Sequence, residues 1–510
     1  AHPTLTSLKE RYPDVHSHNA PWELNPVIGE IDDPAHQEKR ALTLPLSREG
    51  NAVIYGSVGT GAEELASTLV YSLLQDHSPR DLNLYILDFG SELLRSFEEH
   101  PCVGDVAVSD EAEKVRRLFD FLEKEIQTRR KALARAKKSF GAYVQACEEP
   151  LPSVLLILNG MGSFTELYES YEQKLVRVLR DGVRVGIYTV VIATSASEIR
   201  LRLRQGLKQY LACELAHDDD YLQIFSNMRD ISTPRGFGRG IIERENTKYL
   251  FQGAFIESED EDKQEVIEEL CRTSNAKNSA PSIALMPEHI RITDLHIHQK
   301  PSALAIGLYE NNLEPLYLSC EISPIGRVFY LLPQTGREFV RSLDVLAKSE
   351  GVSYKLADID CLLDNPDASK DTYTTDSFTL LSWLKMKETH SFELIVITGI
   401  ESAFSTLDDQ TAIKLKEELG NLKRKGSRFV LFIDNAQNAT SLREGWYLKH
   451  VGQGDGMWIG SGADSSIPFR VSYGSGDKMV GDIETDQGYT LTSGRARRVQ
   501  FIYLPEEEME

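Results

Sequence analysis

A glycine-rich loop between an apolar strand and a helix constrains the fold of this chain more than any other feature. Strand-like residues 52–55 lead into the loop, and a helical run follows at 65–74. The glycine spacing is that of a phosphate-binding loop, whose backbone N–H groups surround phosphate oxygens at a helix N-terminus. The candidate binding residues are Gly56, Ser57, Val58, Gly59, Thr60, Gly61, Ala62 and Glu63.

Two side chains that such a loop needs are replaced. A Lys normally follows the last glycine and neutralises phosphate charge, and the Ser or Thr after it binds magnesium. Ala62 and Glu63 stand at these two positions. Carboxylates are also favoured in the first turn of a helix, so Glu63 and Glu64 are expected to cap the loop from within.

Composition sets the limits for the rest of the chain. A length of 510 residues predicts two or three domains. The formal net charge of -22 argues against nucleic acid as a partner. The six cysteines are widely spaced without a Cys-x-x-Cys pair, which indicates reduced thiols and no metal site. Because the chain starts without Met and has no long apolar run, we expect a fragment whose membrane anchor lies elsewhere.

Strands alternate with helices along the first half of the chain. Apolar segments 82–88, 154–158 and 186–193 predict buried strands, and 110–138 predicts a long helix. This alternation is typical of an α/β domain with a mostly parallel sheet. We expect a first module at 1–257, an acidic and then Asn/Ser/Ala-rich linker at 258–286, and a second module at 287–510. Acidic runs near 257–261 and 506–508 are expected to be solvated.

The same order of strand, loop and helix returns in the second module. Residues 326–338 align with the first loop at an offset of 275, so that Thr335 and Gly336 match Thr60 and Gly61. The second candidate site is therefore Thr335, Gly336, Arg337 and Glu338. Arg337 takes the lysine position there and Glu338 takes the hydroxyl position.

Neither loop has the groups for hydrolysis. Besides the Lys and the hydroxyl, a strand-end acid normally holds magnesium. Asn159 and Thr398 stand at the two strand ends instead. We expect no catalytic residues and no required cofactor, and binding of ATP with magnesium at the first loop stays open. The alternative is a divergent ATPase with residual nucleotide binding or hydrolysis, in which Arg337 or a neighbouring module's arginine replaces the lysine, because an arginine fork also grips phosphate.

Three other motifs have a structural and a functional interpretation. The basic run at 129–138 is either a nucleic-acid patch or a solvated face, and Glu123 and Glu125 on the same helix favour the solvated face. Arg200, Arg202 and Arg204 either face a neighbouring module's phosphate or form a surface turn. The glycines at 452–462 lack the strand-to-helix context of a dinucleotide site.

The quoted loop and several further motifs resemble one family. These are Val27–Pro34 with Gln37, Tyr85–Gly90, Pro101–Gly104 and Gly238–Gly240. Together they resemble FtsK/SpoIIIE-type ATPases of type VII secretion, the EssC/YukB/EccC group. The resemblance implies an α/β fold of two tandem RecA-like P-loop NTPase-type domains with mostly parallel central sheets.

The resemblance also implies a function. Such modules belong to a membrane-associated motor at the cytoplasmic side of the cell membrane, and they assemble as a ring or hexamer. Their partners would be small helical-hairpin WXG-type secreted proteins and the other modules of the same ATPase. The modules here would recognise these substrates and couple them to an upstream active module. A remnant of a DNA translocase is a third interpretation, which the net charge disfavours.

Overall fold

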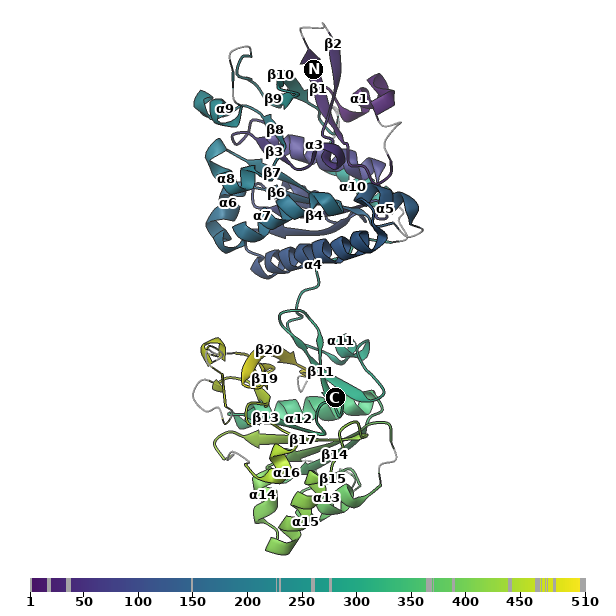
Figure 1. Ribbon diagram of the computed structural model, residues 1–510, viewed down its shortest axis with the longest axis vertical. Helices are drawn as coiled ribbons and strands as arrows, with labels where there is room; N and C mark the ends of the chain where they lie inside the picture. Colours follow the sequence, from purple (N-terminus) through teal and green to yellow (C-terminus); the bar gives the residue numbers. More distant parts are fainter. Residues whose placement is uncertain are drawn as a thin grey trace. The chain divides into compact units, whose positions relative to one another are not determined.

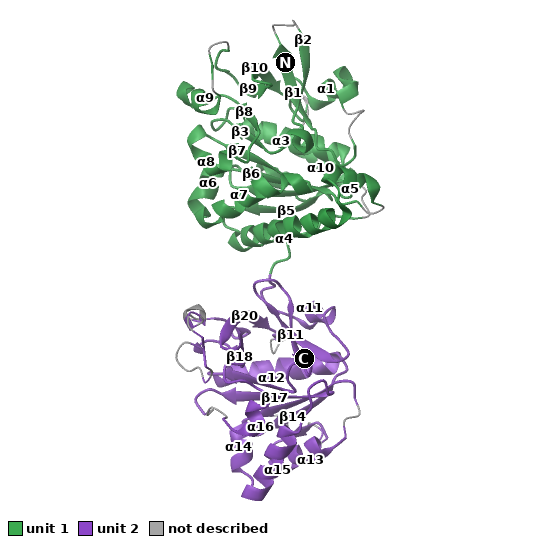
Figure 2. Cartoon of the chain, viewed as in Figure 1, with its two compact units in different colours: residues 1–285 green, residues 286–510 purple. Residues whose placement is uncertain are grey.

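The computed structural model consists of two compact units, Ala1–Leu285 and Met286–Glu510 (Figure 2). Each unit is an α/β domain built on a ten-stranded sheet, which confirms the predicted fold class. The structure describes residues 2–15, 20–33, 38–147, 150–225, 227–228, 231–257, 262–274, 278–363, 369, 371–387, 390–438, 443–463, 468, 470–472, 474, 476–479 and 483–504. Among these residues, no helix combines the length and the apolar character needed to cross a bilayer.

The sheet of the first unit has the order β2-β1-β10-β9-β8-β3-β7-β6-β4-β5 (Figure 1). Its parallel part contains β8 (Gln209–Ala212), β3 (Ala52–Tyr55), β7 (Ile187–Ala193), β6 (Ser153–Asn159), β4 (Leu82–Asp88) and β5 (Val103–Val108). Its antiparallel part contains β1 (Val27–Asp33), β2 (Glu38–Thr43), β9 (Arg239–Arg244) and β10 (Thr247–Gly253). The strand that precedes the glycine loop, β3, thus lies in the middle of the ten-stranded sheet, between β8 and β7.

The helices of the first unit pack on the two faces of its sheet. They are α1 (Leu5–Arg11), α2 (Leu46–Glu49), α3 (Ala62–Asp76), α4 (Ala112–Ala136), α5 (Phe140–Ala146), α6 (Met161–Leu167), α7 (Glu172–Asp181), α8 (Leu201–Arg204), α9 (Asp218–Ile224) and α10 (Lys263–Thr273). Alternate residues of a strand point to opposite faces. Ile54 therefore packs in a cluster with α3, whereas Val53 packs in a second cluster with α4 and α7.

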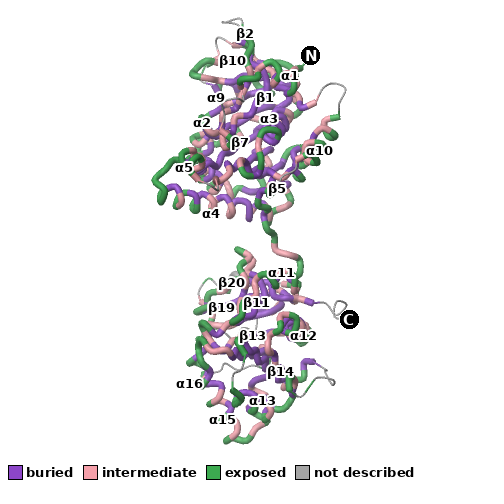
Figure 3. Tube along the Cα trace, turned by 90° about the vertical axis from the view of Figure 1, so that its right-hand side faces the viewer, coloured by how far each residue is buried: buried purple, intermediate pink, exposed green. Residues whose placement is uncertain are grey.

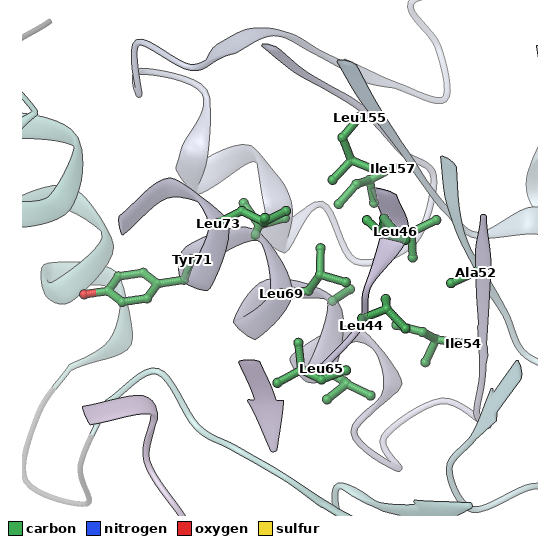
Figure 4. Close-up of a cluster of buried hydrophobic side chains, with 14 of the residues drawn as sticks. Leu44, Leu46, Ala52, Ile54, Leu65, Leu69, Tyr71, Leu73, Leu155 and Ile157 are labelled. Atoms are coloured by element: carbon green, nitrogen blue, oxygen red, sulfur yellow. The ribbon is translucent and has the colours of Figure 1, made fainter. Parts of the chain in front are cut away.

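A buried cluster fixes α3, the helix that follows the loop, against the sheet. Leu65, Leu69 and Leu73 project from α3 toward Ile54 and Ile157 of the sheet (Figure 4). These five side chains are fully or almost fully buried, and each buried aliphatic side chain contributes about 1.5–3 kcal/mol. Buried residues continue along α3 and β7 in Figure 3. Both ends of the loop therefore stand on a rigid core.

The segment expected to be a linker is partly helical. Helix α10 begins after Asp262, whose side chain caps it by accepting from the N–H groups of Gln264 and Glu265. Ile267 is 1% exposed and joins the core beneath α3. The many acidic residues of this segment led to the prediction of a linker, although Ile267 gives the helix an apolar side. The acidic residues 258–261 and 506–508 lie outside the described residues.

The second unit repeats the sheet of the first. Its strand order is β12-β11-β20-β19-β18-β13-β17-β16-β14-β15, which matches the first order position by position. The strands are β11 (Ala303–Tyr309), β12 (Pro315–Ser319), β13 (Ile325–Tyr330), β14 (Ser353–Asp358), β15 (Tyr373–Thr374), β16 (Glu393–Thr398), β17 (Arg428–Asn435), β18 (Gly456–Ile459), β19 (Gln487–Thr492) and β20 (Arg495–Phe501). The helices are α11 (Ile292–His296), α12 (Pro333–Ser349), α13 (Ser377–Lys385), α14 (Ile400–Ser405), α15 (Asp409–Gly420) and α16 (Gly445–Leu448).

A buried histidine predicts that the first unit loses stability in acid. His100 is 1% exposed, and its Nδ1 accepts from the N–H of Cys102 at 3.2 Å. Burial lowers the pKa of His100 from 6.5 to about 4. The folded unit therefore holds a neutral imidazole where the unfolded chain binds a proton, and stability falls as the pH drops from 6.5 toward 4.

We expect His100→Gln to reduce this acid sensitivity by about 1 kcal/mol between about pH 7.5 and about pH 5. Thermal unfolding of the full chain at both pH values measures the effect. The exposed His217, changed to Gln, is the matched control. An equal loss of melting temperature in acid for the wild type and the His100 variant would contradict the assignment.

Candidate functional site

The first glycine loop is held by both neighbouring strands. The N–H of Gly56 donates to the carbonyl of Ala193 at the end of β7, at 3.0 Å. The N–H of Ser57 donates to the carbonyl of Glu214, beyond β8, at 2.9 Å. The hydroxyl of Thr60 closes the loop by donating to the carbonyl of Ser57 at 2.7 Å. All eight predicted residues from Gly56 to Glu63 are therefore brought together in one turn at the carboxyl end of β3.

Two glycines are required by the backbone of this turn. Gly59 and Gly61 have φ angles of 78° and 101°, a region that side chains strongly disfavour. A Cβ atom on Gly61 would also stand 2.5 Å from the backbone nitrogen of Gly238. That nitrogen donates to the carbonyl of Thr60 at 2.9 Å. The glycine spacing of the sequence is thus explained by a close contact with the segment that precedes β9.

The loop keeps the backbone donors of a phosphate site. Among the hydrogen bonds between described residues, the N–H groups of Val58, Gly59, Gly61, Ala62 and Glu63 have no acceptor. Val58 is 89% exposed at the tip, and the methyl group of Ala62 is buried. The backbone can therefore present several N–H groups to an anion, but no side chain of the loop brings a positive charge.

The carboxylate of Glu63 does not cap its own loop, in contrast to the expectation from the sequence. Its Oε1 accepts from Nδ2 of Asn159 at 3.0 Å and from the N–H of Ser91 at 3.2 Å. These partners follow β6 and β4. Gly90 permits the approach, because a Cβ atom there would lie 2.3 Å from Oε1 of Glu63. Glu63 thus connects the start of α3 to the ends of two strands.

Asn159 is the centre of this contact. Its Nδ2 also donates to Oδ1 of Asp88 at 2.7 Å. Asp88 is fully buried, and its carboxylate accepts further from the N–H groups of Gly90 and Leu94, at 3.3 and 2.9 Å. The neutral amide lies between two carboxylates, at the strand end where an active P-loop ATPase carries its magnesium-binding acid. No group of three metal-binding side chains occurs within the described ranges.

The next residue of α3 binds the segment after β10. Oε2 of Glu64 lies 2.7 Å from the ammonium of Lys263, the first residue of α10. Glu257 is half-buried nearby, and the pKa of its carboxyl is raised chiefly by partial burial and also by the charge of Glu64. The first turn of α3 is therefore tied to the segment that was expected to be a free linker.

The second predicted loop is not formed. β13 ends at Tyr330 and α12 begins at Pro333, so that Leu331 and Leu332 alone connect them. Thr335, Gly336, Arg337 and Glu338 are therefore residues of the first turns of α12. Proline favours the first position of a helix because its φ is already helical. Pro333 therefore marks the start of α12 in the sequence. The alignment of Thr335 and Gly336 with the first loop led to the opposite prediction.

The side chains of the second candidate site also point elsewhere. Nε of Arg337 donates to the carbonyl of Leu362 at 3.0 Å, beyond β14. Glu338 accepts from Nε2 of Gln334 at 2.8 Å. A Cβ atom on Gly462 would lie 2.4 Å from the side chain of Leu331, which fills the space beside β13. Among the described residues, Leu331 and Leu332 form no glycine loop between β13 and α12, and the guanidinium of Arg337 contacts Leu362.

Each unit contains an equivalent hydrogen bond at the same place in its sheet, which could not be inferred from the sequence. In the second unit Oγ1 of Thr398 donates to Oδ1 of Asp358 at 2.7 Å. Asp358 also accepts from the N–H groups of Leu362 and Leu363, at 2.9 and 2.8 Å. Asp358 and Thr398 stand in the sheet where Asp88 and Asn159 stand in the first unit. Both units thus use the donor at the end of one strand to hold a buried aspartate of the next.

The remaining motifs are largely occupied within their own units. Arg200 pairs with Glu172 at 2.7 Å, and Arg204 donates to the carbonyl of Ile224 at 2.9 Å, whereas Arg202 is exposed. In the basic run at 129–138, Arg129 is buried and pairs with Glu125, so that only its neighbours form a solvated face. The glycine stretch 452–462 contains β18 and leads into no helix among the described residues.

Comparisons with known proteins agree with this geometry. Residues 6–230 match the model of the FtsK/SpoIIIE family. The chain is 27% identical over 299 residues to the ESX secretion system protein YukB of Bacillus subtilis, covering 56% of this chain and 20% of YukB. It is 24% identical over 309 residues to EccC of Geobacillus thermodenitrificans, covering 58% of this chain and 21% of that protein. The chain thus spans about a fifth of the length of these relatives.

Two solved structures share the fold. "EssC (ATPases 2 and 3)" from Geobacillus thermodenitrificans has a TM-score of 0.80 at 18% identity, over 96% of this chain and 98% of that one. "Thermomonospora curvata EccC (ATPases 2 and 3) in complex with a signal sequence peptide" has a TM-score of 0.59 at 19% identity, over 96% and 95%.

Taken together, the site and the matches define a tandem of P-loop ATPase-type domains. Residues 6–230 form a domain of the FtsK/SpoIIIE family, and the chain is similar to the YukB, EccC and EssC proteins of type VII secretion. This confirms the resemblance that the sequence motifs indicated.

The position of Asn159 between two carboxylates predicts a pH-dependent effect of Asn159→Asp. The new carboxyl would stand beside Asp88 and Glu63, so that ionisation in the folded unit is opposed and its pKa is raised. Stability is then lost as the pH rises above about 3.9, the ordinary value of an aspartate. We expect a destabilisation of about 3 kcal/mol near pH 8, and much less near pH 4.

Thermal unfolding at the two pH values measures this difference. Asn246→Asp, in the exposed turn between β9 and β10, is the matched control and should change little at either pH. A variant at 159 as stable as the wild type near pH 8 would show that the amide does not hold the two carboxylates.

Proposed function

We propose that this chain is the substrate-recognising and coupling part of a type VII secretion motor. Its two ATPase-type units bind an export substrate and transmit its arrival to an active ATPase module in another part of the full-length protein. The observation that carries the proposal is the contact of Glu63 with Asn159, which joins the positions of the magnesium hydroxyl and the magnesium-binding acid.

The charges at the first loop argue against hydrolysis. Transfer of the γ-phosphoryl group depends on cations that neutralise the charge developing on its oxygens. The loop carries Ala62 in place of the Lys, and Glu63 adds a negative charge beside the loop. The free N–H groups of the loop support weak binding of an anion at most. ATP with magnesium is therefore not a required cofactor in this proposal.

A divergent ATPase is the second candidate. It would need Arg337 to replace the lysine, because the second unit offers no other cation at the corresponding position. Arg337 instead donates to the carbonyl of Leu362, from within a helix. The position of this side chain favours the coupling function over the enzyme.

The partner follows from the class of protein. The Thermomonospora curvata EccC structure with the same fold is a complex with a signal sequence peptide. We infer that this chain also binds such signals, and that they belong to small WXG-type secreted proteins with a helical-hairpin fold. In the full-length protein these units would lie at the cytoplasmic side of the membrane, in a ring or hexamer with the other modules.

The proposal predicts binding of an export signal without nucleotide. We expect a fluorescent peptide copying the C-terminal signal helix of a WXG-type protein to bind the full chain in the micromolar range, about -8 kcal/mol. Added Mg-ATP should change the affinity less than about two-fold, since no nucleotide site has to be filled.

A scrambled peptide of the same composition is the control for this titration. Absence of saturable binding would contradict the recognition function. Steady ATP turnover by the chain, abolished in Arg337→Gln, would favour the divergent ATPase instead.

A further inference from the structure

A basic groove lies in the first unit between the C-terminal ends of α4 and α7, which pack side by side (Figure 1). Its volume is about 680 Å³. Its apolar lining consists of Leu133 and Val185, which are buried, and Ala134, which is exposed. Five cationic side chains and one carboxylate form its walls, a net charge of +4: Arg130, Lys137, Lys138, Arg180, Arg184 and Asp181. The whole chain carries a formal charge of -22, so this concentration of cations is local.

Most of this positive charge is not neutralised within the protein. The one carboxylate, Asp181, lies 2.9 Å from Arg180 and 3.5 Å from Arg130. Lys137, Lys138 and Arg184 form no ion pair with any residue that the structure describes. All three are exposed. The groove therefore presents three unpaired cations beside an apolar lining.

The stability of the helices alone does not account for these residues. Cations are favoured near a helix C-terminus, which suits Arg180 at the end of α7. Lys137, however, follows the end of α4 with φ 55° and ψ 41°. Glycine is the residue that ends a helix in this left-handed conformation without strain. A lysine at this position costs backbone strain that a glycine would avoid.

We propose that this groove binds a short acidic peptide segment that carries an apolar residue among its carboxylates. The carboxylates would pair with the unpaired cations of the two walls, and the apolar side chain would lie on Leu133 and Val185. A segment of a few residues fits the volume of the groove and lies inside the local positive field, which extends about 8 Å at physiological salt.

Longer polyanions fit these observations less well. A nucleic-acid duplex would extend far past the groove and meet the negative charge of the remaining surface. A flat anionic membrane would reach the rim of the hollow but not the buried part of its apolar lining. Charge and shape together thus select a short peptide over both.

Residues 504–510 of this chain, Leu-Pro-Glu-Glu-Glu-Met-Glu, have the required chemistry and provide a probe. The experiment titrates a fluorescent peptide of this sequence with the full chain at low salt. We expect saturable binding that Lys137→Gln with Arg184→Gln weakens about two- to thirty-fold, as the loss of two exposed ion pairs predicts. Lys414→Gln with Arg424→Gln, two exposed cations of the second unit, changes the net charge equally and should leave affinity unchanged.

Lys137→Gly separates binding from folding. Because glycine relieves the left-handed residue, this variant should unfold about 2–4 °C higher than the wild type and still bind the peptide more weakly. Absence of saturable binding, equal binding of a peptide with Gln in place of every Glu, or equal affinity in both double variants would overturn the proposal. Phosphatidylglycerol vesicles or a DNA duplex that bind this groove while the peptide does not would also overturn it.

Discussion

The two hydrogen bonds donated by the Asn159 amide are the contact on which the first site depends. One Nδ2 group reaches Asp88 at 2.7 Å and Glu63 at 3.0 Å. The amide lies in a buried region at the carboxyl end of β6, where an unpaired carboxylate would be costly. The amide is neutral and supplies two N–H donors, so that it can accept two negative partners without a metal. The glycine loop, the start of α3 and the ends of β4 and β6 are held together through this one side chain.

The second unit has different contacts at the carboxyl ends of the equivalent parallel strands. Thr398 donates to Asp358, while the loop itself is absent and α12 begins directly at Pro333. The strand order is nevertheless identical in the two units. A parallel sheet that is buried on both faces needs apolar strands in a fixed order. The residues at the strand ends are not constrained by this burial and can differ between the two units. The two units thus retain one architecture with two different strand-end sites.

The fold could be predicted from the sequence because its signals are local. Apolar runs such as 154–158 and 187–193 identify buried parallel strands, and the glycines of the first loop satisfy φ angles that other residues avoid. The site could be predicted only in part. Glu63 and Asn159 are separated by 96 positions, so no local pattern joins them. The second loop was misread because the repeated Thr-Gly pair outweighed Pro333, and α10 was missed because acidic residues conceal its apolar side.

We propose that the first loop does not hold Mg-ATP, because Glu63 and Asn159 occupy the positions of its magnesium ligands and contact each other. Hydrogen exchange of the backbone amides from Ser57 to Glu63, followed by mass spectrometry with and without saturating Mg-ATP, tests it most directly. We expect no added protection in the wild type. Ala62→Lys combined with Glu63→Ser, which restores the cation and the hydroxyl, should gain protection at these amides. Protection of the wild-type loop by Mg-ATP would contradict the account and make the first unit a nucleotide-binding domain.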